Sequence, residues 1–283
     1  MWSTTITIVS ALAEPPTAMA TPAAAHRIVL AVIGFVAAAM LVAAAYHWRR
    51  TGSPAFLLVL AGGYVCSFNE ALVDVLGHCY FPADGLIAYT TFGRAVPVWV
   101  VLAYVVFFGG LTYLQVLWLR RGPSHRAMWA AVGIFWVLNL LLEMPILASG
   151  LYIYYGDQPL VIGGFPVIWL VINSLGSLLA AVVITRLSWF FTGFRQLLLV
   201  LVPFATYMAS WVVTMPHFAI TNTDAPTGVR TIAAIVSMAL GLVSIDVLIR
   251  IGTGQLRLLP PDAATRSADS GVQRVPERAG PRG

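Results

Sequence analysis

The sequence predicts an all-α fold, a polytopic membrane protein built as a single bundle of seven transmembrane helices. Hydrophobic residues make up 59% of the chain and charged residues only 10%. Mean hydropathy is +0.86, and these values are far from the averages of soluble proteins. Seven apolar runs are long enough, at about 20 residues each, to cross the hydrocarbon core of a bilayer, and arginine is concentrated in alternate connections between them.

The predicted helices follow one another with short connections that leave no room for a separate soluble domain. No internal repeat stands out. The seven runs lie near residues 28–47, 54–77, 97–119, 127–150, 163–186, 195–216 and 228–250.

The distribution of arginine predicts the orientation, because cytoplasmic loops collect positive charge. Thirteen arginines fall in the connections after the first, third and fifth runs and after the last run, and only Arg27, Arg94 and Arg230 fall on the other side. The N-terminus is therefore expected outside and the C-terminus inside. The sequence pI near 9.5 then reflects membrane topology, and no nucleic-acid partner is expected.

Three regions are expected. Residues 1–26 form an extracellular arm, which lacks the positive n-region of a signal peptide and is therefore expected to be retained rather than cleaved. Residues 27–252 form the membrane domain, and residues 253–283, rich in Pro, Gly, Ser and Arg, form a disordered cytoplasmic tail. The composition predicts a multi-pass protein of the cell membrane.

Residue chemistry excludes several membrane functions. The chain has no lysine, so the retinal Schiff base of a rhodopsin cannot form in its usual way. The histidines lie near the ends of the predicted helices and form no HxxxH or HExxH pattern within one. No metal and no cofactor are therefore expected.

Three acids lie inside predicted spans, and they are the candidate catalytic residues: Glu70, Asp74 and Glu143. A rise of 1.5 Å per residue places Glu70 and Glu143 roughly 10 Å from the outer ends of their helices, with Asp74 one turn nearer the outside. Acids in a bilayer are costly and usually mark a proton, ion or substrate site. The alternative is that they only join helices by hydrogen bonds, which three acids at one depth would do at high cost.

Other polar and aromatic residues are expected at similar depth or in the outer loops, and each also has a structural interpretation. Arg94 either approaches the acids or anchors the interface, and the asparagines either bind substrate or link helices. Tyr155 belongs either to the pocket or to an aromatic belt. Trp136 and Trp169 either line the pocket or pack against other side chains. Residues 78–96 are expected to form a re-entrant or interfacial segment. The candidate substrate-binding residues are Arg94, Trp136, Asn139, Tyr155, Trp169 and Asn173.

Four blocks of the sequence resemble the actinobacterial AveC-type spirocyclase family over roughly residues 45–250. They are NEALVDVLGHCYFP, FGRAVPVW, LEMPILASGLYIYYGDQPL and GFPVIWLVINS. The resemblance implies an integral-membrane protein of polyketide biosynthesis in secondary metabolism, which closes a dihydroxyketone into a spiroketal and in some versions dehydrates it.

The chemistry implied by this resemblance needs one proton donor and one proton acceptor, which two carboxyls in opposite protonation states provide. Glu70 and Glu143 are the expected acid and base, with Asp74 and Arg94 tuning which carboxyl takes which role. A hydrophobic polyketide-like or isoprenoid molecule and membrane lipid are the expected partners. A membrane terpene cyclase, in which a buried acid protonates an epoxide or alkene, would use a similar pocket. A proton-coupled transporter or lipid-binding protein is a further alternative, although the paired broken helices of an inverted repeat are not visible.

Overall fold

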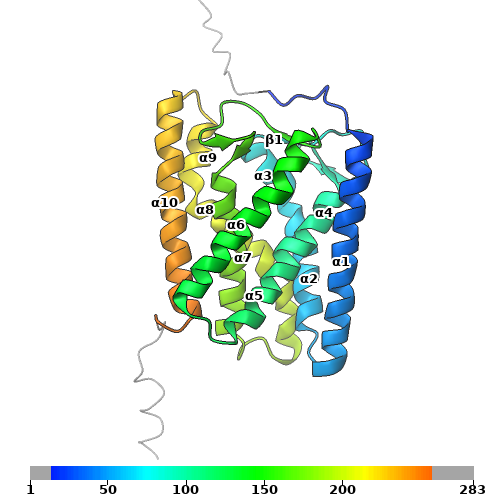
Figure 1. The fold of residues 1–283 in the computed structure, drawn as a ribbon, viewed down its shortest axis with the longest axis vertical. Coiled ribbons are helices and arrows are strands. Elements are labelled where there is room, and N and C mark those ends of the chain that lie inside the picture. The colour runs from blue at the N-terminus through cyan, green and yellow to red at the C-terminus, as the bar shows by residue number, and fades with distance from the viewer. Residues whose placement is uncertain (1–13, 257–283) are drawn as a thin grey trace, which may run out of the picture.

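The structure is a computed structural model that describes residues 14–256, and it is almost entirely helical (Figure 1). Within this part of the chain, six helices are long and apolar enough to cross a membrane. They are Ala23–Thr51, Ala55–Leu76, Val98–Leu119, His125–Ala148, Ile168–Arg186 and Thr227–Gly252. Gly193–Val200 and Val202–Val213 are apolar enough together and, counted as one bent span, make a seventh. The chain is thus a polytopic helical membrane protein, as predicted.

The figure labels correspond to shorter regular segments. The unbroken spans are α1 (Ala23–Thr51), α6 (His125–Ala148), α7 (Ile168–Arg186) and α10 (Thr227–Gly252). The second span contains α2 (Ala55–Cys66), the 3₁₀ turn η1 (Ser67–Asn69) and α3 (Glu70–Leu76). The third contains α4 (Val98–Tyr104), the π-helix η2 (Val105–Leu111) and α5 (Thr112–Leu119). The bent span contains η3 (Gly193–Val200) and α8 (Val202–Val213), followed by α9 (Met215–Thr221).

The described chain begins at one end of the bundle and finishes at the other (Figure 1). α1 begins at the end drawn at the top, called the upper end below, and α10 finishes at the lower end. An odd number of crossings requires this arrangement. The upper end is the one predicted to face outside.

The sixth span, predicted near residues 195–216, is bent. η3 and α8 meet at an angle of 47°, and Pro203 occupies the first turn of α8. Proline suits that position because its missing N–H would have no partner in a first turn anyway. The sequence therefore starts a new helix here instead of continuing the old one.

Short β-structures, rather than loops alone, connect the helices at the upper end. β1 (Cys79–Tyr80) pairs with β4 (Ile153–Tyr154), β2 (Ile87–Thr91) with β3 (Arg94–Pro97), and β5 (Val161–Ile162) with β6 (Phe165–Pro166), all antiparallel. The segment predicted to be re-entrant or interfacial thus contains a hairpin. Its two-residue turn, Phe92 and Gly93, has positive φ at both positions (51° and 70°), as a tight hairpin turn requires.

The second and third spans approach closely because glycines face each other. A Cβ added at Gly63 would lie 2.8 Å from the backbone N of Gly109 and 2.8 Å from the carbonyl O of Tyr104. A Cβ at Gly109 would lie 2.9 Å from the Cα of Leu60. Small residues allow this contact between backbones in membrane bundles, and it fixes α4 and η2 against α2.

The predicted terminal regions are described only in part. Thr21 fastens the segment before α1 to the upper end, since its backbone N and Oγ1 both donate to Oδ1 of Asp84, at 2.8 and 2.6 Å. These two bonds lower the pKa of Asp84. The helix predicted from residue 28 begins at Ala23. The rest of the predicted arm, residues 1–13, and most of the predicted tail, residues 257–283, lie outside the described residues.

Candidate functional site

A local break in the second span positions the first two acids. The tyrosine of β2, Tyr89, donates its phenol to the carbonyl of Ser67, and Asn69 Nδ2 donates to the carbonyl of Phe204 at 3.3 Å. These contacts provide hydrogen-bond partners for the Ser67 carbonyl and the Asn69 amide at the 3₁₀ turn, which lipid could not provide. Beyond the turn, α3 carries Glu70 and Asp74, which are 8% and 1% exposed.

The third span brings a phenol to the first acid. Tyr104 is the last residue of α4, directly before the π-helix, and its phenol donates a hydrogen bond to Oε2 of Glu70. π-turns change the angular position of side chains within a helix and are frequent at functional sites. Here the turn also directs Phe107 and Phe108 towards the same space.

The third acid belongs to a chain of hydrogen bonds between α6 and α7. Asn139 Nδ2 donates to Oε1 of Glu143 at 3.4 Å, and Asn173 Nδ2 donates to Oδ1 of Asn139 at 3.2 Å. Asn139 is 1% exposed and lies one helical turn before Glu143, as the i, i+4 spacing predicts. The two asparagines thus link the helices and orient the acid at once.

All three acids line one cavity of about 110 Å³ near the upper end. Most of the rest of its wall is aromatic or aliphatic, so the acids are the principal charged groups that a ligand there would meet. The lining residues are Ile33, Glu70, Val73, Asp74, Cys79, Phe81, Trp99, Val100, Ala103, Tyr104, Phe107, Phe108, Leu142, Glu143, Ile146, Tyr152, Tyr154, Trp169, Asn173 and Tyr207.

Two polar atoms of this lining are buried and have no hydrogen-bond partner among the described residues. They are Oδ2 of Asp74 and Nε1 of Trp99. Buried polar groups are nearly always paired, so each unpaired group favours a ligand that completes it. The cavity thus offers both a hydrogen-bond acceptor and a donor to a bound molecule.

The upper wall of the cavity is the β1–β4 pair, which carries Cys79 and Tyr154. The indole of Trp169 lies against Tyr154, with ring centroids 5.4 Å apart, and a Cβ at Gly77 would lie 2.7 Å from that indole. The thiol of Cys79 is free, and its burial raises its pKa well above the ordinary value. It is therefore neutral near pH 7.

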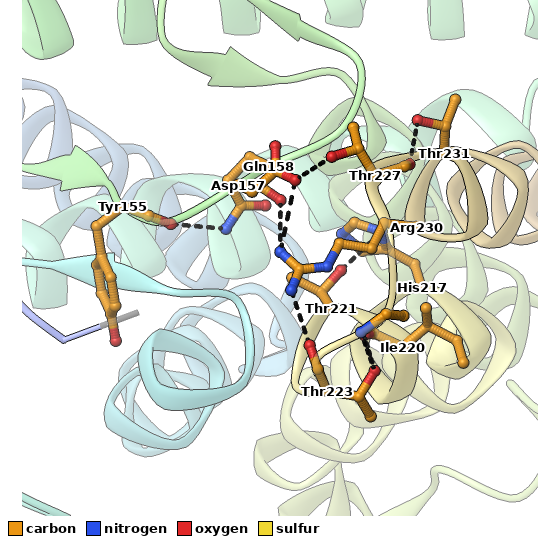
Figure 2. A network of polar contacts seen from close by, with 11 residues as sticks. Tyr155, Asp157, Gln158, His217, Ile220, Thr221, Thr223, Thr227, Arg230 and Thr231 are labelled. Atoms are coloured by element: carbon orange, nitrogen blue, oxygen red, sulfur yellow. Dashed lines mark hydrogen bonds and ion pairs between the residues drawn. The ribbon is translucent and has the colours of Figure 1, made fainter. Parts of the chain in front are cut away.

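A polar network fastens the loop after β4 to the tops of α9 and α10 (Figure 2). Arg230 donates to the carbonyl of Asp157 at 3.3 Å and to the carbonyl of Thr223 at 2.8 Å, and Thr227 Oγ1 donates to Oδ2 of Asp157 at 2.6 Å. Gln158 Nε2 donates to the carbonyl of Tyr155. The loop that follows β4, the strand that forms part of the upper wall, is thus held against α9 and α10.

Four predicted binding residues are absent from the cavity lining: Asn139, which lies directly behind it, and Arg94, Tyr155 and Trp136. Arg94 donates to the phenol of Tyr155 at 2.6 Å instead of pairing with an acid, because it opens β3 above the helices, where Tyr80 and Tyr155 flank its guanidinium at 5.9 and 5.8 Å. Tyr155 also stacks on His78 at 5.1 Å. Trp136 donates to Oγ of Ser174 at 3.1 Å and packs at the α6–α7 contact.

The remaining predicted residues lie at the cavity or directly behind it. Glu70, Asp74, Glu143, Trp169 and Asn173 line it, and Asn139 supports Glu143 from behind. Cys66 precedes the 3₁₀ turn that Glu70 follows, and its thiol donates to the carbonyl of Pro203 at 3.5 Å.

Four polar or indole-bearing lining residues had no site role in the sequence analysis: Cys79, Trp99, Tyr104 and Tyr207. Tyr104 and Tyr207 stand in apolar runs, where a tyrosine usually indicates packing. For Tyr104, a phenol at the depth of the acids was the feature of the sequence that could have indicated a role in the site.

One further acid lies far from the cavity, near the lower end. Asp246 accepts from His125 at 2.7 Å, from Trp129 at 3.1 Å and from Arg250 at 2.6 Å. The pairing with Arg250, four residues on, is local to one face of α10. This cluster links α6 to α10 and is separate from the candidate site.

Within residues 14–256, the His, Cys, Asp and Glu side chains form no group of three or more that could hold a metal ion. Comparisons of the chain with protein-family models, curated proteins and solved structures find no match. The chemistry of the cavity must therefore be inferred from the residues that line it.

Proposed function

We propose that this protein is an integral-membrane cyclase of the cell membrane, similar to the AveC-type spirocyclases, which closes rings on a hydrophobic, oxygenated substrate by acid and base catalysis. The observation that carries the proposal is the convergence of Glu70, Asp74 and Glu143 on one cavity with an otherwise mostly apolar wall. A closed, mostly apolar site with a few convergent polar groups is typical of small-molecule enzymes.

The proposed reaction is the closure of a dihydroxyketone to a spiroketal with loss of one water. One hydroxyl adds to the ketone to give a hemiketal. A carboxylic acid then protonates the hemiketal oxygen, which leaves as water, and a carboxylate removes the proton of the second hydroxyl as its oxygen bonds to the same carbon. Glu70 and Glu143, on different helices, are the proposed acid and base, and Asp74 and Trp99 provide an unpaired acceptor and donor for substrate oxygens.

The aromatic wall supports a second reaction, the cyclisation of an isoprenoid epoxide or alkene. Trp99, Tyr104 and Trp169 line the cavity together with the acids, and aromatic faces stabilise a cation that forms between them. In that reaction, one carboxylic acid would start the cyclisation by protonation, and another carboxylate would remove the final proton.

The two reactions are distinguished by the mass of the product. Membranes that contain the protein would be incubated with a hydrophobic dihydroxyketone and, separately, with an isoprenoid epoxide. Spiroketal closure gives a product lighter by one water, whereas epoxide cyclisation gives an isomer of unchanged mass. Conversion of neither compound beyond that of empty membranes would count against the cyclase proposal. Proton flux into protein-containing vesicles would then favour the transporter.

A further inference from the structure

A second, larger cavity of about 400 Å³ runs beside the acid cavity. It lies between the η2–α5 segment, α6 and α7, and nearly all of its lining is apolar. The lining residues are Phe107, Leu111, Leu114, Gln115, Trp118, Met128, Ala131, Val132, Ile134, Phe135, Leu138, Leu142, Ser174 and Leu178. This cavity is called the α5–α6 groove below.

The α5–α6 groove adjoins the acid cavity, and the two share wall residues. Phe107 and Leu142 line both, and Leu142 directly precedes Glu143 in the chain. The acid cavity, at about 110 Å³, is smaller than the roughly 300–1,000 Å³ of typical ligand pockets. A substrate with a long hydrophobic part therefore needs further space, and the groove adjoins the acids.

The shape of the groove suits a single extended chain. Its lining follows α6 from Leu142 to Met128, which corresponds to roughly 21 Å along the helix axis. Ile134 and Leu138 line the groove and are also 61% and 59% exposed. The groove is thus open on the surface that faces lipid, and a chain can enter it sideways from the bilayer.

One buried polar atom in the groove indicates which kind of chain the groove would bind. Oε1 of Gln115 is buried and has no hydrogen-bond partner in the described part of the chain, while its Nε2 donates to Ser177 Oγ at 3.2 Å. A buried acceptor without a donor is costly. It favours a chain that carries a hydroxyl group part-way along its length over a plain hydrocarbon.

We propose that the α5–α6 groove binds the extended hydrophobic chain of the substrate while its reacting, oxygenated end occupies the acid cavity. This inference rests on the proposed function and deepens it, because it specifies a long, single-chain, hydroxylated amphiphile that enters from lipid between α5 and α6. Phe107 and Leu142, which line both cavities, lie between the chain site and the reaction site.

Photolabelling tests the groove without requiring turnover. The probe is a long-chain primary alcohol with a mid-chain hydroxyl and a diazirine at its far end, added to the full-length protein in phosphatidylcholine nanodiscs. The expected crosslinks, mapped by peptide mass spectrometry, fall on groove residues of α5 and α6. Crosslinks concentrated instead on Val137 and Leu141, which are exposed on α6 but line neither cavity, would overturn the proposal.

Two neighbouring alanines provide a matched pair of variants. Ala131 lines the groove, whereas Ala130 is exposed and does not. Ala131→Trp fills the groove and is expected to lower specific crosslinking by at least about tenfold, while Ala130→Trp labels as wild type. Equal labelling of both variants would contradict the proposal, and if Ala131→Trp does not fold, the wild-type crosslink map decides.

The same experiment separates the groove from the acid chemistry. Glu70→Gln keeps the shape of the side chain, so its crosslinks are expected on the same groove residues as in wild type. Normal groove labelling with unchanged turnover in acid variants would reject the catalytic roles alone. Turnover that depends on the acids, with no labelling of the groove, would reject the chain site alone.

Discussion

The phenol of Tyr104 donates a hydrogen bond to Oε2 of Glu70 between two spans whose backbones meet at glycines. Tyr104 precedes a π-helix and Glu70 follows a 3₁₀ turn, so each residue stands beside an irregularity in its helix. The contact holds a candidate catalytic acid at the point where both helices are irregular. Removing the phenol therefore tests whether the packing of the two spans affects the chemistry.

Tyr104→Phe is expected to lower turnover of an accepted substrate by roughly 10- to 100-fold, because a hydrogen bond to a charged or reacting group contributes about 1.5–3 kcal/mol. The ring that packs against Phe108 and Tyr207 is kept, so the thermal unfolding midpoint should change little. Tyr64→Phe, at a 51% exposed position of the neighbouring α2, is the control. Turnover by Tyr104→Phe equal to that of the control would show that the phenol does not position Glu70.

Gly63→Leu is expected to destabilise the bundle by roughly 1–3 kcal/mol or more, because the new side chain meets the backbone of η2. Thermal unfolding in detergent measures this loss. Gly133→Leu on α6 is the matched control, since a Cβ there meets nothing within 4 Å. Equal unfolding midpoints for the two variants would show that α2 and η2 do not depend on this close approach.

The buried histidine of α9 predicts a loss of stability in acid. Burial, and secondarily repulsion from His78, lowers the pKa of His217 from 6.5 to about 4. Its neutral form stabilises the folded state fully above pH 6.5, and this contribution is lost as the pH falls from 6.5 towards 4. At pH 5.5, the stability lost through protonation of His217 in the unfolded state amounts to roughly 1 kcal/mol.

His217→Gln removes this titration and should therefore flatten part of the decline. Unfolding midpoints at pH 7.5 and pH 5.5 measure the effect for wild type and variant. The expected result is a smaller drop between the two pH values for the variant, whatever its stability at pH 7.5. Identical drops would mean that His217 does not titrate differently on folding.

The membrane-spanning character of the chain and the positions of the acids could be predicted, because both depend on local sequence. Glu70, Asp74 and Glu143 stand out as charges within apolar runs, and helical rise alone gives two of them a common depth. Their convergence on one cavity agrees with that depth argument. The bend in the span near 195–216 was not predicted, because it depends on where a new helix starts at Pro203.

The aromatic part of the site depends on tertiary contacts that a single sequence does not reveal. Tyr104 faces Glu70 only because Gly63 admits the neighbouring backbone and the third span contains a π-turn. For Arg94, the sequence left two interpretations open, an approach to the acids or an anchor at the interface. The β2–β3 hairpin holds it above the helices, beside Tyr155.

The most direct measurement of the central claim is turnover of an accepted substrate by Glu70→Gln and Glu143→Gln, which keep the shape of each side chain and remove its proton chemistry. Asp224→Asn, at an exposed acid before α10, is the control. Loss of general acid or base catalysis is expected to lower turnover by roughly 10²- to 10⁴-fold, while the control matches wild type. Wild-type turnover in both cavity variants would contradict the assignment of these carboxyls as the acid and base.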